Sequence, residues 1–121
     1  MQLKDLPKIE QQAIDLLLQG AKFDVLRRQL NSIIKVDRSE SGSGMYVEFE
    51  FAENVELLGS KASFDIDGVF ATGTNCEEIG FILFVKNGLI DYLEGYVYGE
   101  GAYPSYEGCD YVLSHQSVNR F

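Results

Sequence analysis

The fold of this chain is decided by residues 79–98, IGFILFVKNGLIDYLEGYVY. Asn87 and Gly88, at the centre of the stretch, tolerate the positive φ angles of a tight hairpin turn better than other residue types. Residues 81–85, before the turn, form a continuous apolar run, which is typical of a strand that is covered on both faces. Residues 89–98, after the turn, follow a pattern of period two, which is typical of a strand with two different faces. We therefore predict one long β-hairpin.

The outgoing strand of this hairpin is expected to have two different faces, because successive side chains of a strand point in opposite directions. One face carries Ile90, Tyr92, Glu94, Tyr96 and Tyr98, and the other carries Leu89, Asp91, Leu93 and Val97. If helices cover the first face, Glu94 lies in an apolar, tyrosine-lined setting. If water covers it, the same residues form an ordinary strand surface.

Two helices are expected before the sheet. Apolar residues recur at three-to-four spacing over residues 5–20 and again over residues 24–32, which is the spacing of an amphipathic helix. Asp5 is the expected N-cap of the first helix, Pro7 suits its first turn, and Gly20 suits its end.

Period-two patterns follow the helices. They cover residues 34–39, 45–51 and 111–113, and residues 63–71 with a break at Asp67 and Gly68. The chain is therefore predicted to be α+β, with two N-terminal helices packed on an antiparallel meander of about five to six strands. No repeat or linker divides it, so we expect residues 1–121 to form a single domain.

Charge is distributed unevenly along the chain. The net charge is −9, and residues 41–121 hold thirteen Asp and Glu against three Lys and Arg. Such a field repels phosphate backbones and anionic lipid, so we expect neither nucleic-acid binding nor membrane docking. A basic protein partner is attracted to it. The start of the chain lacks the basic and apolar segments of a secretory signal, so we expect a cytoplasmic protein.

The cysteines and the single histidine form no recognisable metal or catalytic motif. Cys76 and Cys109 are 33 positions apart, and His115 stands alone. In a cytoplasmic chain the two cysteines are expected to be reduced. A disulfide stays open as the alternative, and it requires Cα atoms within about 7 Å. We expect no metal, no cofactor and no catalytic residue.

The candidate contact surface combines phenols and carboxylates from two strands and a loop. Tyrosine offers a rigid contact area with a polar tip, and neighbouring carboxylates steer basic partners toward it. The residues are Tyr46, Glu48, Glu50, Tyr92, Glu94, Tyr96, Tyr98 and Tyr103.

Two stretches resemble a family of small bacterial proteins whose function is uncharacterised. They are FDVLRRQLNSIIKVDRSESGSGMYVEFEF, with an LRxQL-like helix, and GFILFVKNGLIDYLEGYVYGEGAYP, with a GFxLFVxxGxIDxLEGYxY hairpin. Together they cover about residues 23–104, and this chain departs from the pattern in having Ala102 and Tyr103 before Pro104. The resemblance implies one α+β domain, and it implies no activity and no catalytic residues.

Three functions are compatible with these features. The first is a non-catalytic interaction protein, in type similar to an immunity protein that inhibits a basic toxin, and a homodimer through the tyrosine face or an open sheet edge belongs to the same class. The second is a small-ligand-binding domain, with a Tyr/Glu-lined pocket between helices and sheet that is anchored by Glu94. The third is an enzyme that uses Glu94 as a general base. We favour the first, because residues 41–121 are strongly acidic and the tyrosines are expected to be exposed. The third is the weakest, because no second catalytic group accompanies Glu94.

Overall fold

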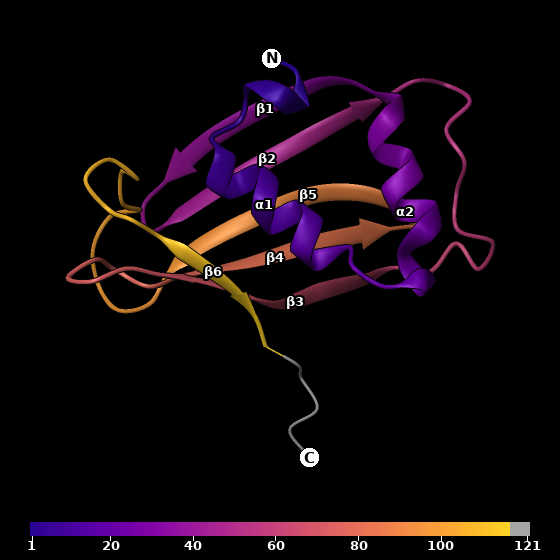
Figure 1. Ribbon diagram of the computed structural model, residues 1–121. Helices are drawn as coiled ribbons and strands as arrows, with labels where there is room; N and C mark the ends of the chain where they lie inside the picture. Colours follow the sequence, from indigo (N-terminus) through magenta and orange to yellow (C-terminus); the bar gives the residue numbers. More distant parts are fainter. Residues whose placement is uncertain (117–121) are drawn as a thin grey trace.

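The computed structural model describes residues 1–116 and shows a helical segment followed by a sheet (Figure 1). The helices are α1 (Lys8–Leu17) and α2 (Asp24–Gln29), with short 3-10 turns at Leu3–Asp5, Ala21–Phe23 and Leu30–Ser32. The strands are β1 (Ile33–Ser41), β2 (Gly44–Phe51), β3 (Phe64–Thr72), β4 (Ile79–Lys86), β5 (Leu89–Val97) and β6 (Val112–His115). The predicted α+β fold is confirmed.

The strands form one antiparallel sheet in the order β1-β2-β5-β4-β3-β6. Consecutive strands β3, β4 and β5 make a meander, the β1–β2 hairpin joins it through β2, and β6 pairs with β3 at the other side. The bent strand expected at residues 63–71 is present as β3, with its register shift between Ile66 and Val69.

Both helices lie on the same side of the sheet and bury their apolar residues against it (Figure 1). Ala13, Leu17 and Leu26 are fully buried, as are Leu83 and Leu93 on the strands beneath them. Burying one such leucine stabilises the fold by about 1.5–3 kcal/mol. We call this side of the sheet the helix side. We call the other side, which no helix within residues 1–116 covers, the open face.

The first helix begins later than predicted. Asp5 is not its N-cap, because the Asp5 carboxylate accepts a hydrogen bond from the Gln2 backbone N–H at 2.8 Å within the preceding 3-10 turn. Leu6 is drawn into the core with 3% of its surface exposed, and α1 starts only after Pro7.

Neither helix is long and apolar enough to cross a membrane, and the same holds for every helix of the described part of the chain.

The hairpin turns at Asn87 and Gly88 as predicted, with φ angles of 53° and 81°. Its outgoing strand, however, contains a β-bulge. Phe84 pairs with Tyr92 but Val85 pairs with Ile90, so Asp91 has no partner on β4. The extra residue reverses the alternation before Tyr92. Ile90, 1% exposed, therefore joins the core, and the prediction that it shares a face with Tyr92 is wrong.

Gln29 holds this end of the hairpin. Its side chain is buried, and its Oε1 accepts a hydrogen bond from the Ile90 N–H at 3.0 Å. Its Nε2 donates to the Gly88 carbonyl at 2.9 Å and to the Glu56 carbonyl at 2.8 Å. One amide thus joins the turn, the bulge and the 52–63 loop. It accepts from the buried Ile90 N–H and is a second donor to the Gly88 carbonyl, which also accepts from the Leu58 N–H at 3.0 Å.

The two cysteines are joined, so the expectation of reduced thiols is wrong. Cys76 and Cys109 form a disulfide with their Cα atoms 6.3 Å apart. It links the loop before β4 to the loop between β5 and β6. Sequence separation says nothing about this proximity, because β3 and β6 bring the two loops together only through their pairing.

Candidate functional site

The open face carries most of the predicted contact surface. Directly paired residues of neighbouring strands point to the same side of a sheet, so the register places Tyr46, Glu94 and Ile82 in one row across β2, β5 and β4. Glu48, Tyr92 and Phe84 form the adjacent row. Each carboxylate therefore has aromatic or apolar neighbours. The open face consists of Tyr46, Glu48, Phe70, Ile82, Phe84, Tyr92, Glu94, Tyr96 and Tyr98.

Two of the tyrosine rings lie flat on the sheet because glycines leave room beneath them. A Cβ atom at Gly80 would overlap the Tyr96 ring, and one at Gly44 would stand 2.6 Å from the Tyr46 hydroxyl. An aromatic ring over a strand glycine shields the bare backbone and is held in place by it. These rings form a fixed platform and need little ordering on contact.

Further aromatic contacts extend this platform across β3, β4 and β5. The Phe84 and Tyr92 rings stack with centroids 4.5 Å apart, and the Phe70 and Tyr98 rings are 5.9 Å apart. The Tyr96 and Tyr98 hydroxyls are hydrogen bonded at 3.1 Å. Tyr98 is still 41% exposed. The aromatic rings therefore make much of the open face apolar, and the tyrosine hydroxyls add polar groups to it.

Among the described residues, no Lys or Arg is paired directly opposite Glu48 or Glu94 on the sheet, whereas Lys35 on β1 lies opposite Glu50 and forms an ion pair with Asp37 at 3.7 Å. Strands β2, β3 and β5 contain no Lys or Arg, and β4 has only Lys86 at its end. Within residues 1–116, neither Glu48 nor Glu94 takes part in an ion pair. Burial, followed by the Glu94 and Asp91 charges, raises the pKa of Tyr92. The face therefore offers neutral phenols and unneutralised carboxylates.

Seven of the eight predicted contact residues lie on the side of the sheet away from the helices, and one does not. Glu50 is at the periphery, since the pairing of β2 with β5 ends at Glu48. Tyr103 is the error. It is 6% exposed and lies on the helix side, where its hydroxyl would stand 2.7 Å from a Cβ atom at Gly95 and is 2.6 Å from the Tyr106 hydroxyl.

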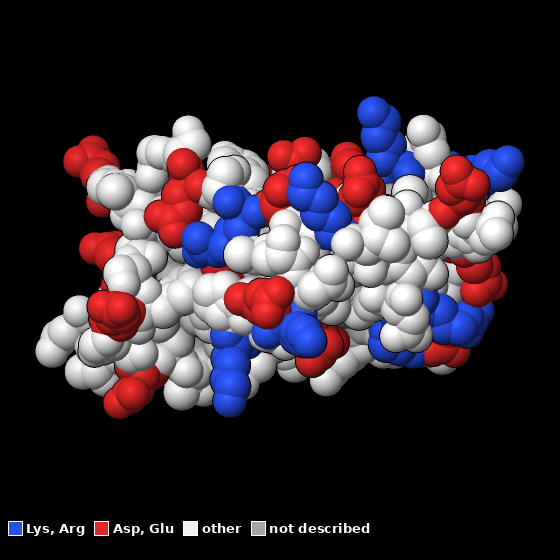
Figure 2. Space-filling view, turned by 90° about the horizontal axis from the view of Figure 1, so that it is seen from above, with Lys and Arg blue, Asp and Glu red and all other residues white. Residues whose placement is uncertain are grey.

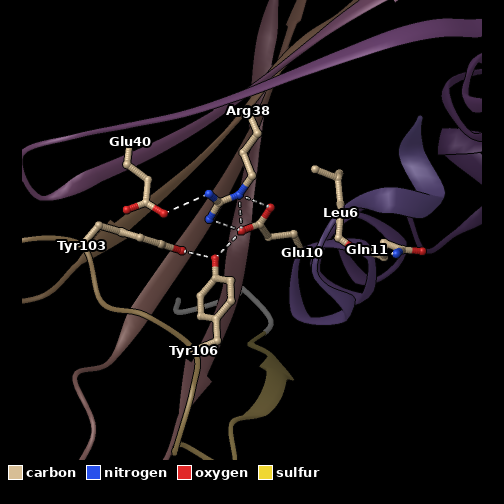
Figure 3. Close-up of polar contacts among 7 residues, drawn as sticks. All are labelled: Leu6, Glu10, Gln11, Arg38, Glu40, Tyr103 and Tyr106. Carbon is tan, nitrogen blue, oxygen red and sulfur yellow. Dashed lines mark hydrogen bonds and ion pairs between the residues drawn. The ribbon is translucent and has the colours of Figure 1, made fainter. Parts of the chain in front are cut away.

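A buried ionic cluster explains the position of Tyr103, and sequence reasoning missed it. Glu10 on α1 is fully buried and pairs with Arg38 on β1 through contacts of 2.7–2.9 Å (Figure 3). The Tyr106 hydroxyl also donates to Glu10, and Arg38 reaches Glu40 at 2.9 Å. The signal for the cluster was an acid on the apolar stripe of α1, three to four residues before Ala13 and Ile14.

This cluster is a structural anchor rather than an open site. Among the described residues that are not exposed, no buried side-chain nitrogen or oxygen lacks a hydrogen-bond partner. Burial, then the Tyr103 and Glu10 groups, raises the pKa of Tyr106 and keeps it a neutral donor. The hydrogen bonds to Glu10 raise the pKa of Arg38. The cluster ties the 98–111 loop to α1 and β1.

The Tyr/Glu-lined pocket expected between helices and sheet is not formed. Leu17 and Leu26 fill that space, and the tyrosines of β5 lie on the opposite side. The bulge at Asp91 adds Ile90 to this packing, because it sets Ile90 and Leu93 together on the helix side. Within residues 1–116, no group of three or more His, Cys, Asp or Glu side chains could hold a metal ion.

Comparison of the chain with protein-family models, with curated proteins and with solved structures returns no match. The functional argument therefore depends on the geometry of the open face.

Proposed function

We propose that this is a non-catalytic binding protein whose open face contacts a basic region of a partner protein. The observation that carries the proposal is the pairing of fixed tyrosine rings with unneutralised carboxylates on one uncovered sheet surface. Arginine and lysine stack on tyrosine faces, and arginine also forms paired hydrogen bonds with carboxylates. One guanidinium over the Tyr46–Glu94 row can make both contacts.

The charge of the whole molecule supports the same partner. Residues 87–116 contain no Lys or Arg, and Figure 2 shows only acidic side chains at the end of the molecule where the β1–β2, β3–β4 and β5–β6 loops lie. Elsewhere in that view acidic and basic side chains alternate. A one-sided negative field accelerates the approach of a positively charged partner.

Within the class of non-catalytic binding proteins, we propose a protein that acts by stoichiometric binding of its partner. An immunity-type inhibitor that covers a basic toxin is the partner relation that we favour, and a toxin gene adjacent to the gene for this chain would support it. The cytoplasmic location expected from the lack of secretory-signal features in the first residues stays a prediction. The Cys76–Cys109 disulfide counts against it, since disulfides persist mainly in oxidising compartments.

A comparison of two charge-reversed variants tests the proposal. The first is Glu48→Lys, Glu50→Lys and Glu94→Lys on the sheet; the second is Glu53→Lys, Glu77→Lys and Glu107→Lys in exposed loops, with the same net charge. A basic partner identified by cross-linking is titrated against both by calorimetry. The first should bind at least about tenfold more weakly, and the second should keep its affinity apart from a slower association. Equal losses would show that net charge alone is sensed.

The oligomeric state provides an independent check. The homodimer that the sequence also allowed would cover the same tyrosines. Sedimentation of the wild-type protein should show a monomer, and a dimer that dissociates on Tyr96→Ser would assign the open face to self-association instead.

A further inference from the structure

The described residues cover only half of the edge of the sheet at β3. β6 pairs with Val69–Thr72, and one more hydrogen bond joins the Gln116 N–H to the Gly68 carbonyl at 2.7 Å. Along Phe64–Asp67 no described strand lies on the outer side of β3. Unpaired backbone donors and acceptors at such an edge are ready to pair with an extended chain.

A cleft of about 870 Å³ opens beside this free edge. Its apolar part includes Leu17, Phe23, Leu58 and Ile66, and of these Phe23 and Leu58 are half-buried. They come from the end of α1, the turn after it, the 52–63 loop and β3. A groove of this size that adjoins an open strand has room for apolar side chains of an added strand.

The two sides of the free edge have different chemistry. Phe64 and Ile66 pair with Val85 and Leu83, which are buried on the helix side, so they face the cleft. Asp65 pairs with Phe84 and therefore points to the open face, and Asp67 next to it is exposed. A strand that pairs here would place alternate side chains in the cleft and beside the two carboxylates.

We propose that the Phe64–Asp67 edge binds an extended peptide segment of a partner by strand addition. The segment alternates apolar residues, which enter the cleft, with Lys or Arg residues, which lie beside Asp65 and Asp67. Backbone hydrogen bonds supply the affinity, and the alternation supplies the specificity. Lys22, in the turn after α1, also lines the cleft. This site does not depend on the function proposed for the open face.

The test uses a fluorescent, end-blocked peptide of about eight alternating lysine and valine residues, titrated against the full chain by anisotropy. The same peptide with alternate backbone amides N-methylated is the matched control. It keeps every side chain but loses the donors on one edge, and it should bind at least about tenfold more weakly. Amide exchange should slow at residues 64–67 on addition of the parent peptide. Equal binding of both peptides would overturn strand addition.

Variants locate the peptide. Asp65→Lys with Asp67→Lys should weaken binding about tenfold, since attraction becomes repulsion at two cross-strand positions. Asp37→Lys, an exposed acid on the other edge strand, should leave the affinity within about threefold, as should Glu48→Lys with Glu94→Lys. A loss of peptide affinity in the Glu48→Lys, Glu94→Lys variant alone would place the peptide on the open face and overturn the assignment. Binding that appears only after removal of residues 117–121 would assign the edge to the end of this chain, and would also overturn it.

Discussion

The two sides of the sheet are formed by the same strands but differ in how their polar side chains are paired. On the helix side Glu10 has Arg38 and Tyr106 as partners, and Gln29 uses both ends of its amide. On the open face, Glu48 and Glu94 have tyrosines beside them and no ion-pair partner within residues 1–116. A buried charge must be paired for the chain to fold, whereas a half-exposed carboxylate can stay free for a partner. Within residues 1–116, carboxylates of equal charge are therefore ion-paired at Glu10 on the helix side and free of ion pairs at Glu48 and Glu94 on the open face.

Among the variants that compare the two sides of the sheet, Arg38→Ala is expected to lower the unfolding free energy most. It leaves the fully buried Glu10 without its counter-ion, which should cost about 3 kcal/mol of unfolding free energy. Arg28→Ala is the control, because the Arg28–Glu56 pair is exposed and its loss should be barely detectable. Urea unfolding of both variants provides the comparison. Similar midpoints would mean that the Glu10 cluster does not anchor the fold.

Gln29→Leu should have the next largest effect, about 2 kcal/mol, because it leaves the buried Ile90 N–H without its acceptor and removes the hydrogen bonds to the Gly88 and Glu56 carbonyls. The Ile90 amide should then exchange faster with solvent, since its acceptor is the Gln29 Oε1. Hydrogen exchange followed by NMR measures this at a single residue. Unchanged protection of Ile90 would show that the bulge persists without the clamp.

Alkaline pH distinguishes the buried phenols of the helix side. Because the pKa of Tyr106 is raised in the folded protein, the unfolded chain loses its proton first, above about pH 10. Stability should therefore fall as the pH rises beyond that value, by up to about 1.4 kcal/mol per pH unit for this phenol. Tyr106→Phe should be less stable at neutral pH but show a shallower fall. Parallel stability curves of the two proteins between neutral and alkaline pH would contradict this.

Gly80→Ala changes the open face and should affect stability less, by about 1 kcal/mol. The new methyl group would overlap the Tyr96 ring, so the ring must rotate away from the sheet and lose its packing over residue 80. Aromatic NMR signals of Tyr96 should shift, and affinity for the basic partner should fall together with the fixed platform. An unmoved ring would contradict the packing described.

Glu94→Gln should have the smallest effect on stability, within about 0.5 kcal/mol, because it removes a charge that has no partner in the described fold. Its partner affinity should still fall, since the carboxylate is the proposed contact for a guanidinium. Thermal unfolding and calorimetry of the same preparation separate the two effects. A large loss of stability with unchanged affinity would assign Glu94 a structural role.

The fold was more predictable than the candidate site. The strand and helix patterns identified both helices, the long hairpin and a bent β3, because these depend on spacing within a few residues. The structure brings the predicted contact residues except Tyr103 to one side of the sheet, and their contact with a partner stays a prediction. Tyr103 is buried because Gly95 leaves room for its ring and Glu10, far away in the chain, provides the end of its hydrogen-bond chain.

Local sequence by itself determined the turn at Asn87 and Gly88, the alternation of β2, and the negative charge of the β-rich part. Tertiary structure alone decided that Ile90 is buried on the same side as Leu93, since the bulge at Asp91 shifts the alternation and the acceptor of the Ile90 N–H is Gln29, 61 positions away. It likewise decided that Cys76 and Cys109 meet. A pattern of period two gives the order of side chains along a strand, but the face that each one occupies depends on partners brought close only by folding.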